Sequence, residues 1–248
     1  MKNQYLFNFK TNISGITIPV KLNNPFALNS SEIAKIAVQE FQAFISLEGS
    51  KWDYDFEIRS GKMFGVLVVQ KLDNTYAYLG TSSGELSRKK TCERFTPAVF
   101  DISTDDYFIN KDMTEITVIG TQIKNAKNWT EAKELKEIRR QKSIAVQEKL
   151  FKHYAFLNIH GEVQNLLQIF KNSANRNPPA ATGECAAPKL LQYALKNSLK
   201  PIALAEFWWG NPSKGKERKH KVFYPSCKNK CKPILEFILD DSGLYSSL

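Results

Sequence analysis

GECAAPKLLQYALKNSLKPIALAEFWWGNPSKGKERKHKVFYPSCKNKCKPILEFILD, residues 183–240, is the stretch that decides the fold. It holds Cys185 before one helical pattern, and the close pair Cys227 and Cys231 where a second helical pattern begins. Between them lies a strongly apolar strand, residues 201–209. Thiols at two helix starts, with a buried strand between, can meet at one point. We therefore expect a tetrahedral zinc site with one position left for water or another ligand. Three thiols without a metal are the alternative.

The composition bounds the class of protein. The 248 residues, 42% hydrophobic and 24% charged, suffice for the core of one large domain or two small ones. A formal net charge of +10 favours a polyanionic partner such as nucleic acid about as much as a merely solvated basic surface. No apolar run approaches about 18 residues, and the first twelve residues lack the apolar core of a signal peptide. We expect a cytoplasmic protein without a membrane segment, whose four cysteines do not form a disulfide scaffold.

Periodicity predicts the remaining elements. Apolar residues recur at helical spacing over residues 32–47, and residues 61–70 and 75–84 form a hairpin of apolar strands. Gly65 and Gly80 are expected to be strand-end glycines rather than points of close backbone approach. Further predictions are strands at 6–9, 16–20 and 115–120, a long charged helix at 130–157 and a short helix at 162–170. The mixed charge of the long helix is typical of an exposed arm.

The order of elements in this chain resembles that of the cytidine deaminase-like superfamily. It is a helix, an apolar hairpin, a cysteine at a helix start, a strand, and a cysteine pair at a second helix start. In that superfamily, a His-x-Glu or Cys-x-Glu motif and a Pro-Cys-x-x-Cys motif open two helices, hold zinc and supply a proton-carrying glutamate. Residues 185–187 and 225–231 correspond to these motifs. The resemblance implies an α/β fold: a mixed sheet with helices on both faces, in a single domain over residues 1–248. Residues 85–177 would be a long insertion that contains the charged helix.

Two departures bear on catalysis. Ala187 occupies the position of the family's glutamate, and the pair is spaced Cys-x-x-x-Cys, with Ser226 after Pro225. A spacing of four still places both thiols on one helical face, so metal binding is expected to survive.

Proton transfer would then need another group. The candidates are Glu184, Glu206 and His220, and we assign the catalytic role to Glu184. With it, the chain would be a zinc-dependent deaminase or hydrolase acting on a nucleobase, a nucleotide or RNA.

Several blocks also resemble the N-terminal extension of a bacterial group of RluA-type pseudouridine synthases. They are GKMFGVLVVQ, FTPAVFDI, KLFKHYAFLNIHGE, PPAATGECAAPKLLQYAL, LKPIALAEFWWG and FYPSCKNKCKPIL, and they cover most of residues 15–240. The synthase's own His-Arg-Leu-Asp segment, which carries the catalytic aspartate, does not occur in the chain. The resemblance therefore implies an RNA-modification context and an RNA or nucleotide partner, not isomerisation.

The segment after the apolar strand combines cations with aromatic rings, the ingredients of single-strand binding. Its candidate nucleic-acid-binding residues are Lys214, Lys216, Arg218, Lys219, Lys221, Lys228 and Lys230. The alternative is that the rings belong to the core and the lysines coat a loop. Trp208 and Trp209 face opposite sides of a strand, so one is expected in the core and the other in a pocket.

Four residues are expected to line that pocket: Lys189, Glu206, Trp208 and His220. Glu206 lies in an apolar run and needs a partner, for which Arg218, Lys189 and a water on the metal are candidates. For Lys189, an ordinary exposed position is the favoured alternative. Three hypotheses remain: a zinc-binding, RNA-associated accessory protein, an active zinc hydrolase, and a structural zinc module that mediates protein contacts.

Overall fold

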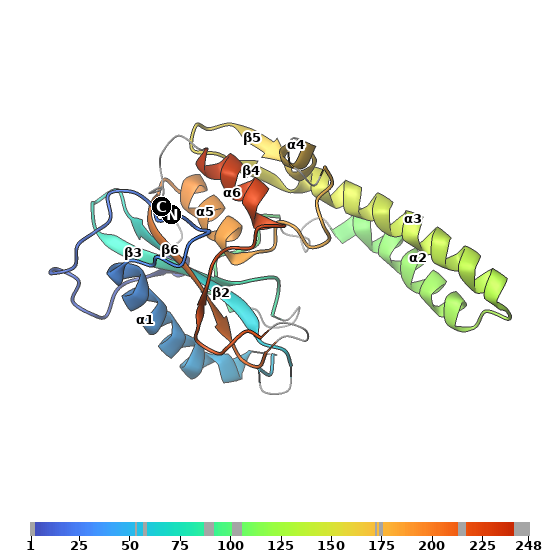
Figure 1. The fold of residues 1–248 in the computed structure, drawn as a ribbon, viewed down its shortest axis with the longest axis horizontal. Helices are drawn as coiled ribbons and strands as arrows, with labels where there is room; N and C mark the ends of the chain where they lie inside the picture. The colour runs from blue at the N-terminus through green and yellow to red at the C-terminus, as the bar shows by residue number, and fades with distance from the viewer. Residues whose placement is uncertain are drawn as a thin grey trace.

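The computed structural model describes residues 3–52, 54–56, 59–86, 92–100, 106–171, 173, 176–212 and 217–240. A five-stranded sheet forms the centre, with helices on both of its faces (Figure 1). Its order is β1-β3-β2-β6-β7. The strands are β1 (Leu6–Phe7), β2 (Lys62–Gln70), β3 (Tyr76–Ser82), β6 (Lys200–Trp209) and β7 (Phe223–Tyr224). The α/β class and the helices on both faces are therefore confirmed.

Every strand pair of this sheet is antiparallel, so the expected mixed sheet is wrong. β2 and β3 form the predicted hairpin, and β6 pairs with the other side of β2. The outer edge of β6 is occupied by β7, which pairs with it antiparallel through Glu206 and Phe207.

Two hydrophobic cores lie against the two faces of the sheet. Side chains alternate along β2, so that Phe64 and Val66 face one core while Leu67 and Val69 face the other. Helix α1 (Glu32–Glu48), with the short η2 (Gly49–Lys51) after it, covers the first face. On the second face, α5 (Ala186–Lys196) lies on the sheet, and α6 (Cys231–Leu239) packs against α5. The predictions for α1, the hairpin and β6 are confirmed.

Close packing fixes two glycines of the hairpin, contrary to expectation. A Cβ at Gly65 would lie 2.8 Å from the Cβ of Ala186, and one at Gly80 would lie 2.3 Å from the Phe41 ring. Both glycines therefore allow a helix to approach the sheet, α5 on one face and α1 on the other.

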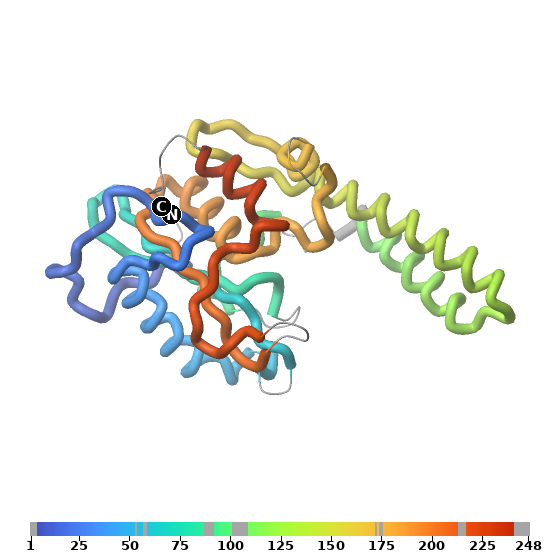
Figure 2. Tube along the Cα trace, in the orientation of Figure 1, coloured from blue at the N-terminus to red at the C-terminus, as the bar shows by residue number. Residues whose placement is uncertain are grey.

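A hairpin of two long helices projects from this body (Figure 2). It consists of α2 (Asp106–Lys124) and α3 (Trp129–His153). The strand expected at residues 115–120 is wrong, because Ile109, Ile116 and Ile119 recur at helical spacing and are buried. α3 is the predicted long charged helix, and its projecting position is the predicted arm. The helix ends at His153 and not at residue 157 as expected, because Ala155–Leu157 form strand β4, which pairs with β5. Treating residues 85–177 as an insertion into a single domain stays a prediction.

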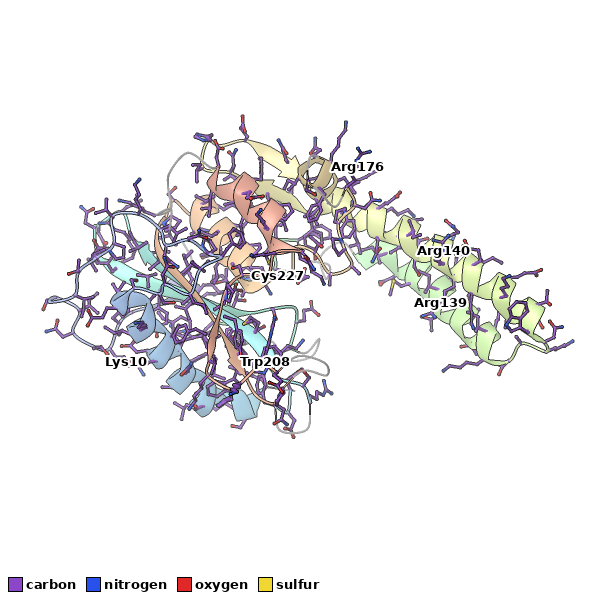
Figure 3. The ribbon with its side chains drawn as sticks, viewed as in Figure 1. Lys10, Arg139, Arg140, Arg176, Trp208 and Cys227 are labelled. Atoms are coloured by element: carbon purple, nitrogen blue, oxygen red, sulfur yellow. The ribbon has the colours of Figure 1, made fainter. Side chains whose placement is uncertain are left out.

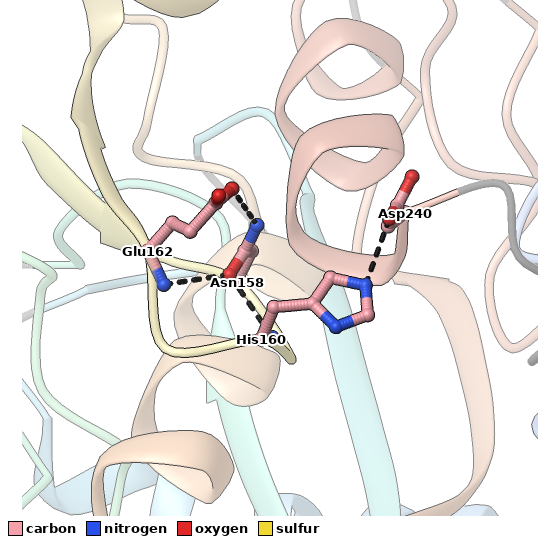
Figure 4. Close-up of polar contacts among 4 residues, drawn as sticks. All are labelled: Asn158, His160, Glu162 and Asp240. Carbon is pink, nitrogen blue, oxygen red and sulfur yellow. Dashed lines mark hydrogen bonds and ion pairs between the residues drawn. The ribbon is translucent and has the colours of Figure 1, made fainter.

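A short hairpin joins the arm to the sheet. It comprises β4 (Ala155–Leu157) and β5 (Val163–Asn165), followed by α4 (Leu166–Lys171). The helix expected at 162–170 therefore begins only at Leu166, and residues 16–20 form no strand, while η1 (Asn3–Tyr5) precedes β1. The β4–β5 turn is held by Asn158, and the Nε2 of His160 lies 2.8 Å from Asp240 Oδ2 at the end of α6 (Figure 4). This contact anchors the helix that begins at Cys231.

Candidate metal centre

The start of α5 is positioned by a tight turn. Gly183 has a φ of +97°, and a Cβ there would lie 2.7 Å from the Tyr154 ring, so only glycine fits. The carbonyl of Glu184 accepts the Gly84 N–H at 2.7 Å, which ties the turn to the end of β3. Cys185 follows as the N-cap of α5, with extended backbone.

The start of α6 is positioned by a single turn of chain. The N–H of Cys231, the first residue of α6, donates to the carbonyl of Cys227 at 3.2 Å. The pair is therefore brought together by a turn that precedes the helix, not by the face of a continuous helix as expected. Figure 3 labels Cys227, in the segment that leads from β7 into α6.

The three sulfur atoms converge. Those of Cys185, Cys227 and Cys231 all lie within 4.8 Å of one another, and the last two are 3.3 Å apart. Tetrahedral zinc with Zn–S bonds near 2.3 Å requires sulfur separations of about 3.8 Å, so small side-chain adjustments suffice. No other His, Cys, Asp or Glu in the described residues joins this group, and Cys92 lies apart from it. These three cysteines could hold a metal ion.

The electrostatics of the cluster fit a cation. Hydrogen bonds from the other two thiols, together with the N–H groups of Lys230 and Cys231, lower the pKa of Cys227. The hydrogen bond with Cys227 raises the pKa of Cys185, and neighbouring sulfurs and burial raise that of Cys231. These shifts favour ionisation of Cys227 over that of its two neighbours. A divalent cation allows all three to ionise, which is the state that binds metal.

Glu206 lies beside the cluster, on the face of β6 that α5 covers. Its carboxylate accepts a hydrogen bond from Ser226 Oγ at 2.5 Å and another from the N–H of Ala187. Burial raises the pKa of Glu206 to about 7, and the charge of Cys227 adds to the rise, while Arg218 opposes it. The partner of this buried carboxylate is therefore Ser226, whose only sequence signal is its position next to Cys227.

Glu184 and Lys189 lie on the other side of the α5 start. The Tyr154 hydroxyl donates to the Glu184 carboxylate, which is not part of the sulfur cluster. Lys189 is only 4% exposed, and its Nζ donates to the Gly84 carbonyl at 3.3 Å. The favoured interpretation of Lys189 as an exposed lysine is therefore wrong, because the loop after β3 covers that side of α5. Burial lowers the pKa of Lys189, while Glu184 and Cys185 raise it.

Both tryptophans of β6 are buried, Trp208 at 5% and Trp209 at 8% exposure. Trp208 donates its indole N–H to Asn211 O at 3.0 Å, and the Arg218 guanidinium lies 5.1 Å from its ring centroid. His220 is exposed, accepts the Gly210 N–H at Nδ1 and packs on Trp209, which belongs to the core on the α1 side. His220 is therefore not brought to the cysteines.

The predicted basic segment is described only in part. Lys214 and Lys216 lie outside the described residues. Lys219, Lys221 and Lys228 are exposed, and Arg218 and Lys230 are half-buried. The segment thus offers cations at the surface, but its two tryptophan rings do not face solvent.

The space beside Glu206 is small. A cavity of about 10 Å³, lined by Glu206, Ser226, Asn23, Pro25 and Ser30 among others, has room for about one water molecule.

Within the described part of the chain, no helix has the length and apolar character needed to cross a membrane. Comparison with protein-family models, with curated proteins and with solved structures found no match.

Proposed function

We propose that this chain is a zinc-binding accessory protein of RNA modification, which binds RNA and does not itself make pseudouridine. The observation that carries the proposal is the convergence of Cys185, Cys227 and Cys231 from two helix starts. Three thiolates whose sulfurs lie within 4.8 Å of one another suit a single zinc ion.

The position of the cluster supports a structural role. Cys185 belongs to α5 and Cys231 to α6, and all three cysteines pack against the core formed by α4, α5, α6 and the sheet. Zinc, when bound, supplies the charge that lets the three thiols ionise together. The residues themselves then join the start of α5 to the segment before α6, two points 42 residues or more apart in sequence.

The RNA part of the proposal rests on charge and on the resemblance. The chain carries a net charge of +10, and exposed cations surround the segment between β6 and α6. The exposed cations, Lys219, Lys221 and Lys228, can neutralise phosphates, while Arg218 is half-buried. Since Trp208 and Trp209 are buried, these two rings cannot stack on bases.

Metal analysis of the purified full chain tests the zinc proposal. We expect stoichiometric zinc, lost in Cys185→Ser and Cys227→Ser and kept in the matched control Cys92→Ser, because Cys92 lies outside the cluster. Purification without zinc, or equal zinc in all three variants, would refute the site. RNA association is tested separately, by titrating a labelled oligoribonucleotide at several salt concentrations. Affinity that is absent, or that does not fall with salt, would refute that part.

One observation favours a second candidate, a zinc-dependent deaminase or hydrolase. Glu206 is a buried carboxylate with a pKa of about 7, and it interacts electrostatically with the cysteine cluster. A group with that pKa is suited to proton transfer at neutral pH. In this candidate Glu206 takes the role that the sequence assigned to Glu184, whose carboxylate is already engaged by Tyr154.

The two candidates are separated by assay. Ammonia release is measured across free bases, nucleosides, nucleotides and RNA, with Glu206→Gln and Glu184→Gln as the paired variants. The enzyme candidate predicts release that only Glu206→Gln abolishes while zinc content stays unchanged. No release from any of these substrates favours the accessory protein.

A further inference from the structure

The tip of the α2–α3 arm presents one exposed tryptophan. Trp129, the first residue of α3, is 74% exposed, whereas Trp208 and Trp209 are buried and Trp52 is half-buried. A ring in solvent keeps its apolar face and its indole N–H available to a partner.

The backbone that carries the ring is held in place. Asn128 Oδ1 accepts the Glu131 N–H at 2.9 Å, and Glu131 Oε2 accepts the Lys127 N–H at 2.8 Å. These two bonds cap α3 and fix the direction in which the chain enters it. Trp129 is therefore displayed by a rigid helix start.

Cations follow Trp129 along one face of α3. Lys133, Lys136 and Arg140 lie four, seven and eleven residues further on, a spacing that keeps them on the same side of the helix as Trp129. The Lys133 Nζ lies 5.0 Å from the Trp129 ring centroid. The face extends over roughly 16 Å. We call these four residues the arm face, and Figure 3 labels Arg140 on it.

Carboxylates of the arm are largely occupied elsewhere. Glu115 and Asp112 pair with Lys142 and Lys149 at 2.6 Å each, between the two helices. Arg140 of the arm face pairs with Glu137 at 2.7 Å, so it is the member of the face whose charge is already partnered. By contrast, in the described residues Lys136 has no ion-pair partner, and the same holds for Lys124 and Lys127 at the tip. Residues 124–142 carry seven cations and three acids. The outer side of the arm is therefore open to an anion.

We propose that the arm face binds single-stranded RNA, with Trp129 stacked on a base and Lys133 and Lys136 on the flanking phosphates. The inference rests on the proposed RNA association and names the surface that would supply a stacking ring. Trp208 and Trp209 cannot supply it, because both are buried. A lone ring followed by cations, with no second apolar residue among the four, suits a base and its phosphates. It offers too little apolar area for a protein groove.

The test measures binding of a labelled single-stranded oligoribonucleotide to the full chain by fluorescence anisotropy. Trp129→Ala should weaken binding by about 5-fold to about 150-fold, the range for losing one base–aromatic stack, and leave the salt dependence unchanged. Trp129→Phe should retain most of the affinity. Lys133→Gln with Lys136→Gln should instead lower the slope of log affinity against log salt by about 1.4. The charge-matched pair Lys21→Gln with Lys35→Gln, exposed on the body, should not reproduce that loss.

Failure of this inference is distinguishable from failure of the proposed function. If Trp129→Ala binds like the wild type while Lys219→Gln with Lys221→Gln weakens binding, the arm face is not the site and RNA association stands. If the wild type binds no oligoribonucleotide, both fall. If Trp129→Ala weakens binding to anionic phosphatidylserine vesicles but not to RNA, the arm inference is overturned. It is also overturned if Trp129→Ala binds single-stranded RNA and single-stranded DNA as tightly as the wild type does.

Discussion

Replacing Gly65 with alanine tests how the sheet places the metal centre. The added Cβ would lie 2.8 Å from Ala186 Cβ and 3.0 Å from Leu190 Cδ1, whereas carbon atoms attract best at about 3.5–4.0 Å. Helix α5 or strand β2 must therefore move by roughly 1 Å near the first turn of α5. Overpacking of this kind costs about 1–3 kcal/mol of unfolding free energy.

The same displacement reaches the cluster, because Cys185 immediately precedes Ala186. Metal sites tolerate errors of only about 0.2 Å in ligand distance, so we expect Gly65→Ala to bind zinc about 10- to 100-fold more weakly. Urea unfolding of the metal-free chain and competition with a chromophoric chelator measure the two effects separately. The control is Gly15→Ala, since a Cβ at Gly15 meets nothing within 4 Å. Unchanged stability and unchanged zinc affinity in Gly65→Ala would refute the packing argument, and lost stability with unchanged affinity would place the movement in β2.

Three further changes test separate parts of the structure. The Asn23 side chain exchanges hydrogen bonds of 2.7 and 2.9 Å with the N–H and carbonyl of Leu204. Asn23→Ala should therefore lower the free energy of unfolding by about 2–4 kcal/mol in urea, and an unchanged value would contradict this. Gly120 lies inside α2, and an added Cβ there would have its nearest neighbour at 4.0 Å. Gly120→Ala should therefore raise the free energy of unfolding by about 0.8–1 kcal/mol, and a lowered value would contradict the helical assignment. Burial and Lys221 lower the pKa of His220, so the folded chain protonates later than the unfolded one as pH falls. Stability should therefore fall by less than about 1 kcal/mol as pH drops below about 6.5, and this fall should vanish in His220→Gln.

Periodicity predicted the elements that carry their own pattern. α1 and the β2–β3 hairpin match the expectation because apolar residues recur at the period of each structure, and neither requires knowledge of distant contacts. Residues 115–120 were misjudged because β-branched residues raise strand propensity locally, while the partner that selects a helix, α3, lies further along the chain. The mixed sheet came from the resemblance alone, and no residue pattern in β6 or in the two-residue β7 indicates the direction in which either strand pairs.

Some features of the candidate site could be predicted from the sequence and others could not. The three cysteines were predictable because helix starts are visible in sequence, and each start fixes the direction of its first side chain. The burial of Lys189 was not predictable, because it depends on the loop after β3, which reaches α5 through the Gly84 carbonyl. Trp208 was expected to face a pocket, but the Asn211 carbonyl and the Arg218 guanidinium cover its ring.

The relation between Ala187 and Glu206 shows why a motif alone misjudges this site. The helix supplies no carboxylate at residue 187, yet its backbone N–H there binds the carboxylate of Glu206 from the neighbouring strand. Gly65 makes this possible, since a side chain opposite Glu206 on β2 would hold the start of α5 away from the sheet. A carboxylate thus lies beside the cysteines although the motif position that would provide it is alanine. Whether that carboxylate only caps the helix or also moves protons is decided by the paired Glu206→Gln and Glu184→Gln measurements, because a cap affects stability alone.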